Sequence, residues 1–268
     1  MNEEDLTINK KRIFFFDVDE TLYSNNKKEV LPQTEKLILE LSKKPDTILG
    51  IATGRNYKNL DVIKKILPFF KYFIISNGAV TIKNNKIIDE NPIPKEKIIE
   101  LIQKINLHKV VIANIGKEKE ALFHNGNIEN LPFIKEWNRM IKTPIDNKFH
   151  LKERIYMINI FGIDANKIKK ILDKEDHFNR YYWEKHIDIT LKDINKFFGI
   201  NKIKKNYPKH ELICVGDGCN DQEMLQQADI SIVMGNSQYD FLKKNSSFIT
   251  PHIEENKIFD FFKKEKLV

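Results

Sequence analysis

The sequence of 268 residues has few cysteines and no long uninterrupted apolar run. Its two cysteines, Cys214 and Cys219, do not form a CxxC pair and are too few for a structural zinc site, so both are expected to be reduced thiols. The most apolar stretch, residues 66–75, is interrupted by Pro68 and Lys71, so no bilayer-spanning segment is predicted. The N-terminal residues MNEEDLTINKK lack the apolar centre of a signal peptide. We therefore expect a cytoplasmic protein that has no membrane partner.

The chain carries a modest excess of positive charge. Lysine and arginine number 45 against 38 acidic residues, a formal net charge of +7. The lysines alternate with acidic residues and form no continuous basic stripe, so we expect no nucleic-acid partner. The positive field would instead attract a small anionic molecule. With 41% hydrophobic and 31% charged residues, the composition is that of a globular protein of one large or two modest domains.

Three short apolar runs end abruptly in polar residues. Residues 13–16 are followed by Asp17 and Asp19, residues 47–52 by Thr53, and residues 211–215 by an acidic loop that begins at Gly216. Unbroken apolar runs of this length are typical of strands buried on both faces of a parallel sheet. Helical patterns at 32–41 and 57–67 separate the first strands, as in βαβ units. Ligands bind at the carboxyl ends of such strands, so we expect a site at this edge.

The middle of the chain has a different pattern of predicted strands and helices. Residues 80–190 read as an α+β block, with hairpins at 80–88 and 178–190, further strands at 109–113, 121–123 and 155–161, and helices at 94–105, 134–141 and 165–172. No carboxylate cluster follows a strand in this block. We therefore predict a core domain made of residues 1–79 and 191–268 and an inserted domain, residues 80–190, that shapes a substrate pocket. Further helices are expected at 193–200 and from Ile253 onward.

The pair of carboxylates after the first strand restricts the chemistry. In an extended chain Asp17 and Asp19 point toward the same side. Two such charges repel each other unless a cation lies between them or one carries a proton. This arrangement suits a Mg²⁺ ion together with a nucleophilic carboxylate and a neighbouring acid or base. An acidic loop without catalytic function is the alternative that this motif alone leaves open.

Four separated motifs resemble those of one superfamily. They are DVDET at 17–21, ATGR at 52–55, NK at 195–196 and GDGCND at 216–221, with SNG at 76–78 and MGNS at 234–237 in register. In order and spacing the chain resembles the haloacid dehalogenase (HAD) superfamily, and in particular Cof-type phosphatases with a type IIB cap. The resemblance implies a three-layer, Rossmann-like α/β core with a parallel sheet and an inserted α+β cap. It also implies a Mg²⁺-dependent phosphatase that acts on small phosphorylated metabolites, such as sugar phosphates, nucleotides or cofactor phosphates.

Residue by residue, the resemblance assigns the following roles. Asp17 would be the nucleophile that forms an aspartyl-phosphate, and Asp19 the acid and base. The phosphoryl oxygens would be held by Thr53 and Lys196, and the Mg²⁺ ion by Asp17, the backbone carbonyl of Asp19, and Asp217, with Asp221 supporting the metal site. Further phosphate or substrate contacts are expected from Thr21, Gly54, Arg55, Asn195 and Asn220.

Several residues have a second interpretation. Thr21 and Thr53 could serve only as turn or capping residues, and Arg55 and Asn220 could stabilise structure instead of binding phosphate. Cys219 is expected to be a loop residue, because no histidine accompanies it in the motif. Residues 181–183, Tyr-Tyr-Trp, either pack the insert or line its pocket. For the whole chain, the alternatives are a phosphosugar mutase and a catalytically silent regulator that binds a small molecule. A monomer or weak homodimer is expected.

Overall fold

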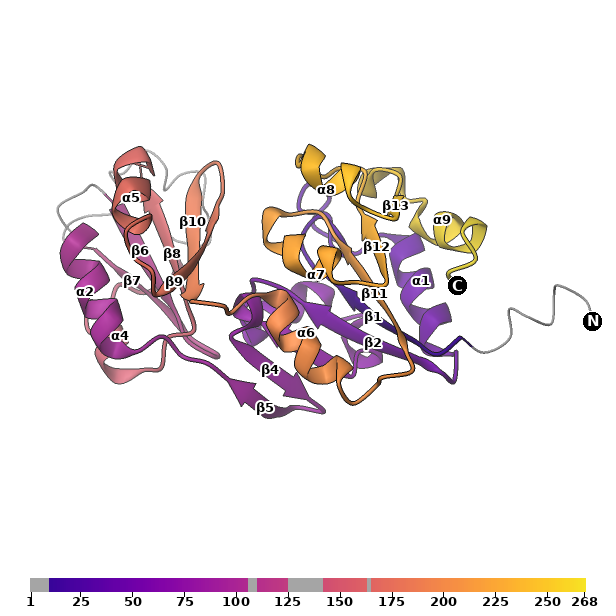
Figure 1. Cartoon of the computed structure of the whole chain (residues 1–268), viewed down its shortest axis with the longest axis horizontal. Coiled ribbons are helices and arrows are strands. Elements are labelled where there is room, and N and C mark those ends of the chain that lie inside the picture. Colours follow the sequence, from indigo (N-terminus) through magenta and orange to yellow (C-terminus); the bar gives the residue numbers. More distant parts are fainter. Residues whose placement is uncertain (1–9, 106–109, 125–141, 163–164) are drawn as a thin grey trace, which may run out of the picture. The chain divides into compact units, whose positions relative to one another are not determined.

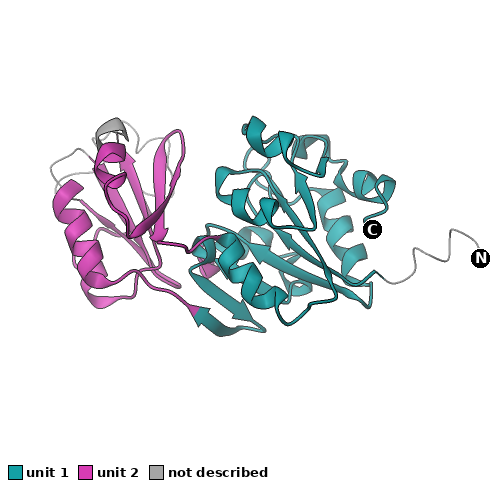
Figure 2. Ribbon diagram, viewed as in Figure 1, with its two compact units in different colours: residues 1–55, 59–89, 196–268 teal, residues 56–58, 90–195 magenta. Residues whose placement is uncertain are grey.

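The structure, a computed structural model, describes residues 10–105, 110–124, 142–162 and 165–268 (Figure 1). The chain divides into two compact units (Figure 2). The first contains residues 1–55, 59–89 and 196–268, and the second contains residues 56–58 and 90–195. In the described part of the chain no helix has the length and apolarity needed to cross a membrane. The predicted helix at 134–141 lies outside the described residues.

The first unit is built on an eight-stranded sheet in the order β13-β12-β11-β1-β2-β3-β4-β5. The strands are β1 (Arg12–Phe16), β2 (Thr47–Ala52), β3 (Tyr72–Ile75), β4 (Val80–Lys83), β5 (Lys86–Glu90), β11 (Glu211–Gly216), β12 (Ile230–Val233) and β13 (Phe248–Ile249). From β13 to β3 every pair is parallel, and β4 then pairs antiparallel to β3. The predicted parallel sheet is therefore confirmed, and β1 lies in its interior with a partner on each side.

Alternating side chains of β1 fill both faces of this sheet. Phe14 and Phe16 stack on each other and approach Phe262 of helix α9 (Ile258–Lys264), near which helix α1 (Pro32–Ser42) also packs. Ile13 and Phe15 belong to the opposite core, which includes residues of the helices α6 (Lys196–Lys204), α7 (Gln222–Gln226) and α8 (Asp240–Lys244). Helices thus cover both faces, and the expected three-layer α/β core is confirmed.

The junction between the units differs from the predicted one. The hairpin of β4 and β5 is expected from the sequence to open the insert, but both strands extend the sheet of the first unit. Alternating hairpin sequences do not specify which sheet they join, and β4 pairs with β3 because only residues 76–79, which include the 3-10 turn Ser76–Gly78, separate them. The second unit accordingly begins at Glu90, and the chain returns to the first unit at Lys196.

Three predicted helices also differ in kind or extent. Residues 57–67 form the 3-10 segments Tyr57–Ile63 and Leu67–Phe69 instead of an α-helix. Leu60, Ile63 and Ile66 are buried at intervals of three residues, the period of a 3-10 helix. The helix expected at 193–200 is α6, which begins only at Lys196. The terminal helix begins with the 3-10 turn Ile253–Glu255 and continues as α9.

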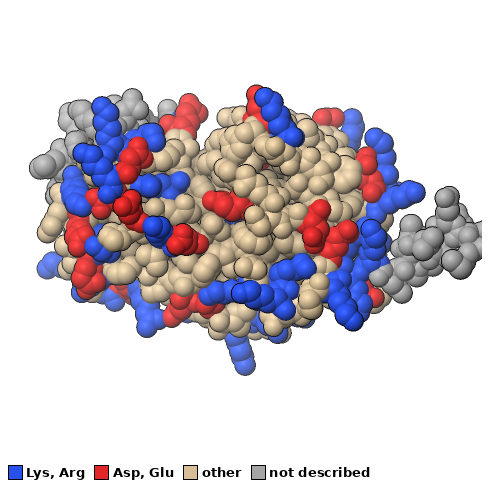
Figure 3. Space-filling view, viewed as in Figure 1, with Lys and Arg blue, Asp and Glu red and all other residues tan. Residues whose placement is uncertain are grey.

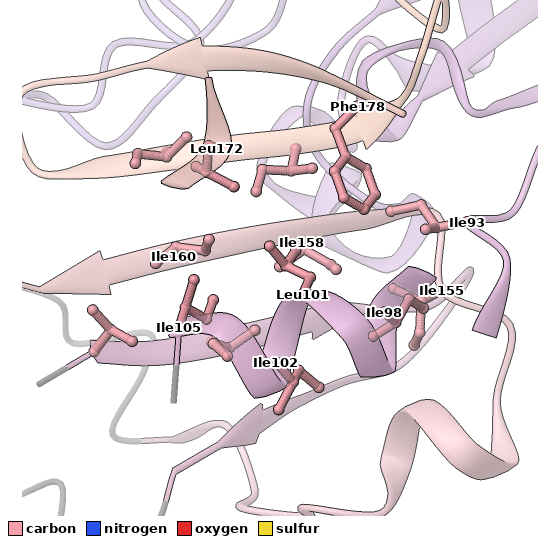
Figure 4. Packing of buried hydrophobic residues seen from close by; sticks show 14 of the residues in the cluster. Ile93, Ile98, Leu101, Ile102, Ile105, Ile155, Ile158, Ile160, Leu172 and Phe178 are labelled. Carbon is pink, nitrogen blue, oxygen red and sulfur yellow. The ribbon is translucent and has the colours of Figure 1, made fainter. Parts of the chain in front are cut away.

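The second unit contains a five-stranded antiparallel sheet in the order β7-β6-β8-β10-β9. The strands are β6 (Val110–Ile115), β7 (Glu120–Phe123), β8 (Met157–Gly162), β9 (Phe178–Tyr182) and β10 (His186–Leu191), and the helices are α2 (Lys95–Ile105), α4 (Phe149–Lys152) and α5 (Ala165–Leu172). Isoleucines and leucines of α2, α5 and one face of the sheet form the core of the unit (Figure 4). The expected α+β character of this unit is confirmed.

The opposite face of that sheet carries a second apolar cluster and a buried polar network. Asp188 accepts hydrogen bonds from Asn159 Nδ2 at 2.5 Å and from Trp183 Nε1 at 3.0 Å, and His186 Nε2 lies 3.2 Å from the same carboxylate. Elsewhere on the surface, acidic and basic side chains are interspersed on the face that Figure 3 shows. Among the described residues, that face carries no continuous basic stripe.

Candidate active site

Asp17 and Lys196 meet at the carboxyl end of the central strand. Asp17 directly follows β1, and its backbone N–H donates to Val215 O of β11 at 2.9 Å, which continues the parallel pairing by one residue. Lys196 is the first residue of α6 and is completely buried. Its Nζ lies 2.8 Å from Asp17 Oδ1. A buried ammonium requires an anionic partner, and this carboxylate supplies one.

Asp221 is the second partner of Lys196. Its Oδ1 accepts a hydrogen bond from Lys196 Nζ at 2.6 Å, and its Oδ2 accepts from the backbone N–H groups of Asp217 and Gly218, both at 2.9 Å. Asp221 therefore fixes the loop that follows β11 and connects it to the lysine. Gly216 permits this geometry, because a Cβ at that position would lie 2.5 Å from the carboxylate of Asp221.

Three carboxylates converge here as a candidate cation site. One oxygen from each of Asp17, Asp217 and Asp221 lies within 4.8 Å of the others. Thr21, which is fully buried, donates its hydroxyl to Asp217 Oδ1 at 3.3 Å, and Ser237 donates its hydroxyl to the backbone O of Asp217 at 2.6 Å. Hard oxygen ligands grouped in this way are the donor set that Mg²⁺ prefers. The residues present thus fit the predicted metal.

The electrostatics of the three carboxylates support the same conclusion. Burial raises the pKa of Asp17 to about 7, with the charges of Asp221 and Asp19 adding to the shift and Lys196 opposing it. Burial also raises the pKa of Asp217 well above its usual range, and the charges of Asp17 and Asp221 add to it. Burial alone would lower the pKa of Lys196, but Asp17 and Asp221 outweigh it and raise the pKa. One lysine does not neutralise the group, so a further cation would be stabilised there.

Asp19 lies in a different environment from Asp17. Arg55 donates from Nε to Asp19 Oδ2 at 2.8 Å and from Nη2 to Asp19 Oδ1 at 2.7 Å, and its Nη1 donates to Asn59 O at 2.9 Å. Burial of Asp19 would raise its pKa, but the hydrogen bonds and charge of Arg55 outweigh that effect and hold the pKa below its usual value. The guanidinium predicted to contact phosphate is thus bound to the predicted acid and base.

The loop after β2 is held by the loop after β3. Thr53 is fully buried, its N–H donates to Ile74 O at 2.8 Å, and its hydroxyl accepts from the N–H of Arg55 at 3.2 Å. A Cβ on Gly54 would lie 3.2 Å from the side-chain oxygen of Asn77. The same Asn77 oxygen accepts a hydrogen bond from Asn220 Nδ2 at 2.9 Å, and Asn220 Oδ1 is buried with no hydrogen-bond partner among the described residues.

The structure thus brings most of the predicted residues together. Asp17, Lys196, Asp217 and Asp221 form one connected group, and Thr21 joins it through Asp217. Asp19 with Arg55, and Thr53 with Gly54 and Asn220, come from the ends of the neighbouring strands. Asn195 is half-buried and is the last residue grouped with the second unit.

Two residues with structural roles at the site are absent from the predicted set. Asn77 has a φ of 53°, in the left-handed region, and positions the amide of Asn220. Ser237 anchors the loop that carries Asp217. Both lie within the SNG and MGNS motifs, which could have identified them.

Comparison with known proteins identifies the family of the chain. The model of the haloacid dehalogenase-like hydrolase family matches residues 14–262. One relative, "Putative phosphatase YkrA" of Bacillus subtilis (strain 168), is 25% identical over 253 residues, which cover 92% of this chain and 95% of the relative. Another from the same organism, 5-amino-6-(5-phospho-D-ribitylamino)uracil phosphatase YcsE, is 24% identical over 259 residues, covering 93% and 92%.

Solved structures share the fold. The HAD subclass IIB sugar phosphatase BT4131 superposes with a TM-score of 0.79 at 21% sequence identity, covering 96% of this chain and 100% of that one. At this level of identity the likeness concerns the fold, and it agrees with an α/β core that carries an inserted α+β unit.

Proposed function

Because the chain belongs to the haloacid dehalogenase-like hydrolases and is a Cof-type phosphatase, we propose that it hydrolyses phosphate monoesters of small metabolites through an aspartyl-phosphate on Asp17, with Mg²⁺ as cofactor. The observation that carries this proposal is the contact between Lys196 Nζ and Asp17 Oδ1 at 2.8 Å, within a group of three carboxylates at the strand ends. A carboxylate approaches a phosphate dianion only where positive charge offsets the repulsion. Lys196 supplies part of that charge.

The nucleophilic role of Asp17 rests on its position. It follows the central strand directly, and its Oδ1 faces Lys196. In the proposed reaction its free carboxylate oxygen attacks phosphorus, the bond from phosphorus to the ester oxygen breaks, and the leaving alkoxide takes a proton from Asp19. Asp19 then removes a proton from the water that hydrolyses the aspartyl-phosphate. The two hydrogen bonds of Arg55 orient Asp19 and favour its ionised form, which suits the second step, so Asp19 must take up a proton before it acts as the acid of the first.

The phosphoryl oxygens would be held by side chains already fixed in place. Lys196 is completely buried, and Thr53 is held by its backbone bond to β3. Such preorganised donors stabilise developing charge at little cost of reorganisation. The hydroxyl of Thr21 already donates to Asp217 Oδ1, a side chain of the proposed metal site.

The proposed Mg²⁺ ion would be held by Asp17, the backbone carbonyl of Asp19, and Asp217. When bound, the ion would neutralise negative charge on the phosphoryl group. Both oxygens of Asp221 already accept hydrogen bonds, one from Lys196 and the other from two backbone N–H groups. Its role in the metal site is therefore to hold the loop of Asp217 in position.

The substrate class is proposed from the named relatives and from the second unit. One relative is named as a phosphatase of a phosphorylated ribitylamino-uracil, and one structural neighbour as a sugar phosphatase. Both names refer to polar, phosphorylated small molecules. We therefore propose a sugar phosphate, a nucleotide or a cofactor phosphate as substrate, with the second unit selecting the leaving group.

The test is phosphate release from a panel of such monoesters, with and without Mg²⁺, by wild-type protein and Asp17→Asn. We expect the Asp17→Asn variant to lose at least about 10⁴-fold in kcat, because an amide cannot form the acyl phosphate. Asp46→Asn is the matched control, since Asp46 pairs with Lys11 at the opposite end of the strands. Release without any second substrate distinguishes a phosphatase from a mutase. Activity that survives Asp17→Asn would disprove the assignment of the nucleophile.

A further inference from the structure

The second unit contains a hollow of about 170 Å³ between helix α5 and the turn of the β9–β10 hairpin, and all of its lining residues belong to that unit. It lies where β8 ends and β6 begins. The two connections to the first unit leave from the other end of the sheet, after β10 ends at Leu191 and near Ile93, which bonds to Ile155 just before β8. At about 3.3 Å per residue, the length of β8 separates the hollow from these connections by roughly 17 Å.

The floor of the hollow is apolar and comes from elements that pack in the core of the unit. Its side chains are those of Val110, Ile160, Ile168 and Ile187, which are all at least nine-tenths buried. Apolar cavities of about 150 Å³ lined by such residues stay dry and accept a molecule of the size of benzene. At about 170 Å³ the hollow as a whole, floor, wall and rim together, has room for one six-membered ring.

The wall next to the turn is aromatic and rigid. Tyr182 and Trp183 both line the hollow. The indole of Trp183 stacks on His186, with ring centroids 5.6 Å apart and planes 11° from parallel, and its N–H donates to Asp188. The hydroxyl of Tyr182 donates to Asp173 at 2.8 Å. Both rings are thus held in place, and Tyr182, which pairs with Ile187 of the floor, offers π surface to a flat ligand.

The rim carries positive charge. Lys169 and Lys185 line the hollow and are exposed, whereas none of the lining residues that the structure describes is acidic. The ammonium of Lys169 lies 4.2 Å from the ring centroid of Tyr182 and 3.3 Å from a carboxylate oxygen of Asp173, just outside the lining. An anionic group placed at this rim would face two lysines while its ring entered the apolar floor.

We propose that this hollow is a second ligand site, which binds a small single-ring carboxylate. Its ring occupies the floor formed by the isoleucines and Val110, and its carboxylate lies against Lys169 and Lys185. The site requires none of the residues of the strand-end carboxylate group. The alternative is a packing void. It would bind no ligand, and a larger side chain that filled it would only make the folded protein more stable.

The probe is benzoate, and the reporter is Trp183. The chain has two tryptophans, so Trp137→Phe leaves Trp183 as the only indole. We expect a saturable change in its fluorescence with a Kd on the order of 1 mM at constant ionic strength. Benzyl alcohol, which has the same ring but no charge, should bind at least about tenfold more weakly. No saturable change, or equal binding of the two probes, would overturn the proposal.

Two further variants locate the site. In the Trp137→Phe background, Lys169→Gln with Lys185→Gln should weaken benzoate binding about tenfold, whereas Lys170→Gln, on the same helix but outside the lining, should leave it unchanged. Ile160→Phe should abolish binding by filling the floor. Saturating inorganic phosphate should not displace benzoate. Unaltered binding in the double lysine variant, or displacement by phosphate, would place benzoate elsewhere and refute the site.

Discussion

Arg55 donates two parallel hydrogen bonds to Asp19, from Nε to Oδ2 at 2.8 Å and from Nη2 to Oδ1 at 2.7 Å. This fork-to-fork geometry fixes the plane of the carboxylate as well as its position, which a lysine cannot do. Asp17, by contrast, faces Lys196 and is withdrawn from solvent. Two carboxylates only two residues apart thus have opposite electrostatic environments, one with a lowered and one with a raised pKa. The proposed reaction requires an ionised Asp17 and a protonated Asp19, the reverse of this order in the metal-free protein, so the charge of a bound cation would have to lower the pKa of Asp17 before it attacks.

Replacing Arg55 by lysine should reduce kcat more than it reduces the affinity for substrate. We expect Arg55→Lys to lower kcat about 10–100-fold while KM changes less than about threefold, because Asp19 loses its fixed orientation but substrate contacts remain. Steady-state kinetics on the best substrate measure both. Arg12→Lys is the matched control, since Arg12 pairs with Glu211 at the opposite end of β1 and should keep full activity. A loss confined to KM would instead indicate that Arg55 binds substrate.

Removing the buried lysine should cost stability as well as activity. Lys196→Met leaves Asp17 and Asp221 buried without their cation, so we expect a loss of about 3–5 kcal/mol in the free energy of unfolding. Urea denaturation at neutral pH without Mg²⁺ measures it. Lys202→Met, in the same helix, breaks a partly exposed pair with Asp89 and should cost at most about 1 kcal/mol. Equal losses in the two variants would contradict the role of Lys196.

Mg²⁺ should stabilise the folded protein through its proposed ligands, which include the carboxylates of Asp17 and Asp217. A ligand present at 100 times its Kd adds about 2.7 kcal/mol to the free energy of unfolding, so thermal denaturation should shift upward with added Mg²⁺. Asp217→Asn should abolish most of this shift. Asp229→Asn should retain it, because Asp229 bonds to the backbone of Leu212 at the start of β11. An undiminished shift in the Asp217→Asn variant would exclude Asp217 as a ligand.

The raised pKa of Asp17 predicts how pH affects the metal-free protein and its metal affinity. The pKa is about 7 in the folded protein against an ordinary value of 3.8, so between these values the folded state binds more protons than the unfolded one. The contribution of Asp17 to stability is therefore greatest below pH 3.8 and is lost as the pH rises toward 7. Because a proton competes with the cation, Mg²⁺ affinity should increase as the pH rises from about 6 to 8.

Calorimetric titration with Mg²⁺ at several pH values tests this prediction. In wild-type protein the apparent Kd should fall by up to about tenfold per pH unit below the pKa, because one proton leaves as the ion binds. Asp17→Asn should bind more weakly and with a shallower pH dependence. A Kd that is independent of pH in wild-type protein would show that Asp17 is already ionised before the metal binds.

The sequence predicts the strand ends well but not the contacts between them. The apolar runs before Asp17, Thr53 and Asp217 are long enough to identify buried parallel strands, and parallel strands place their carboxyl ends at one edge. The pairing of Arg55 with Asp19 does not follow from the sequence, because it depends on the conformation of two loops that are far apart along the chain. Local patterns carry no information on such a contact.

Lys196 is a second example of what local sequence patterns cannot predict. Among 45 basic residues nothing in local composition distinguishes it, and only its place in the family motif identifies it. Its complete burial, which explains why this lysine is special, follows from the packing of α6 against the sheet. Gly199 of that helix could not carry a side chain without displacement, since a Cβ would lie 2.8 Å from Ile74.

A substitution at Gly216 tests the loop geometry without removing any functional group. A Cβ at this position would lie 2.5 Å from both Cγ and Oδ2 of Asp221, closer than real side chains approach. Gly216→Ala must therefore move the carboxylate away from the backbone N–H groups of Asp217 and Gly218. We expect Mg²⁺ affinity to fall about tenfold, the usual effect of disturbing a residue that positions a metal ligand, with a parallel loss of activity at limiting Mg²⁺. Gly235→Ala is the matched control: its Cβ would meet backbone atoms of residues 250–252, so it should lower stability without changing Mg²⁺ affinity in the folded protein. If Gly216→Ala bound Mg²⁺ normally, the position of Asp221 would not matter for the metal site, and the lysine contact alone would explain why an aspartate occupies that position.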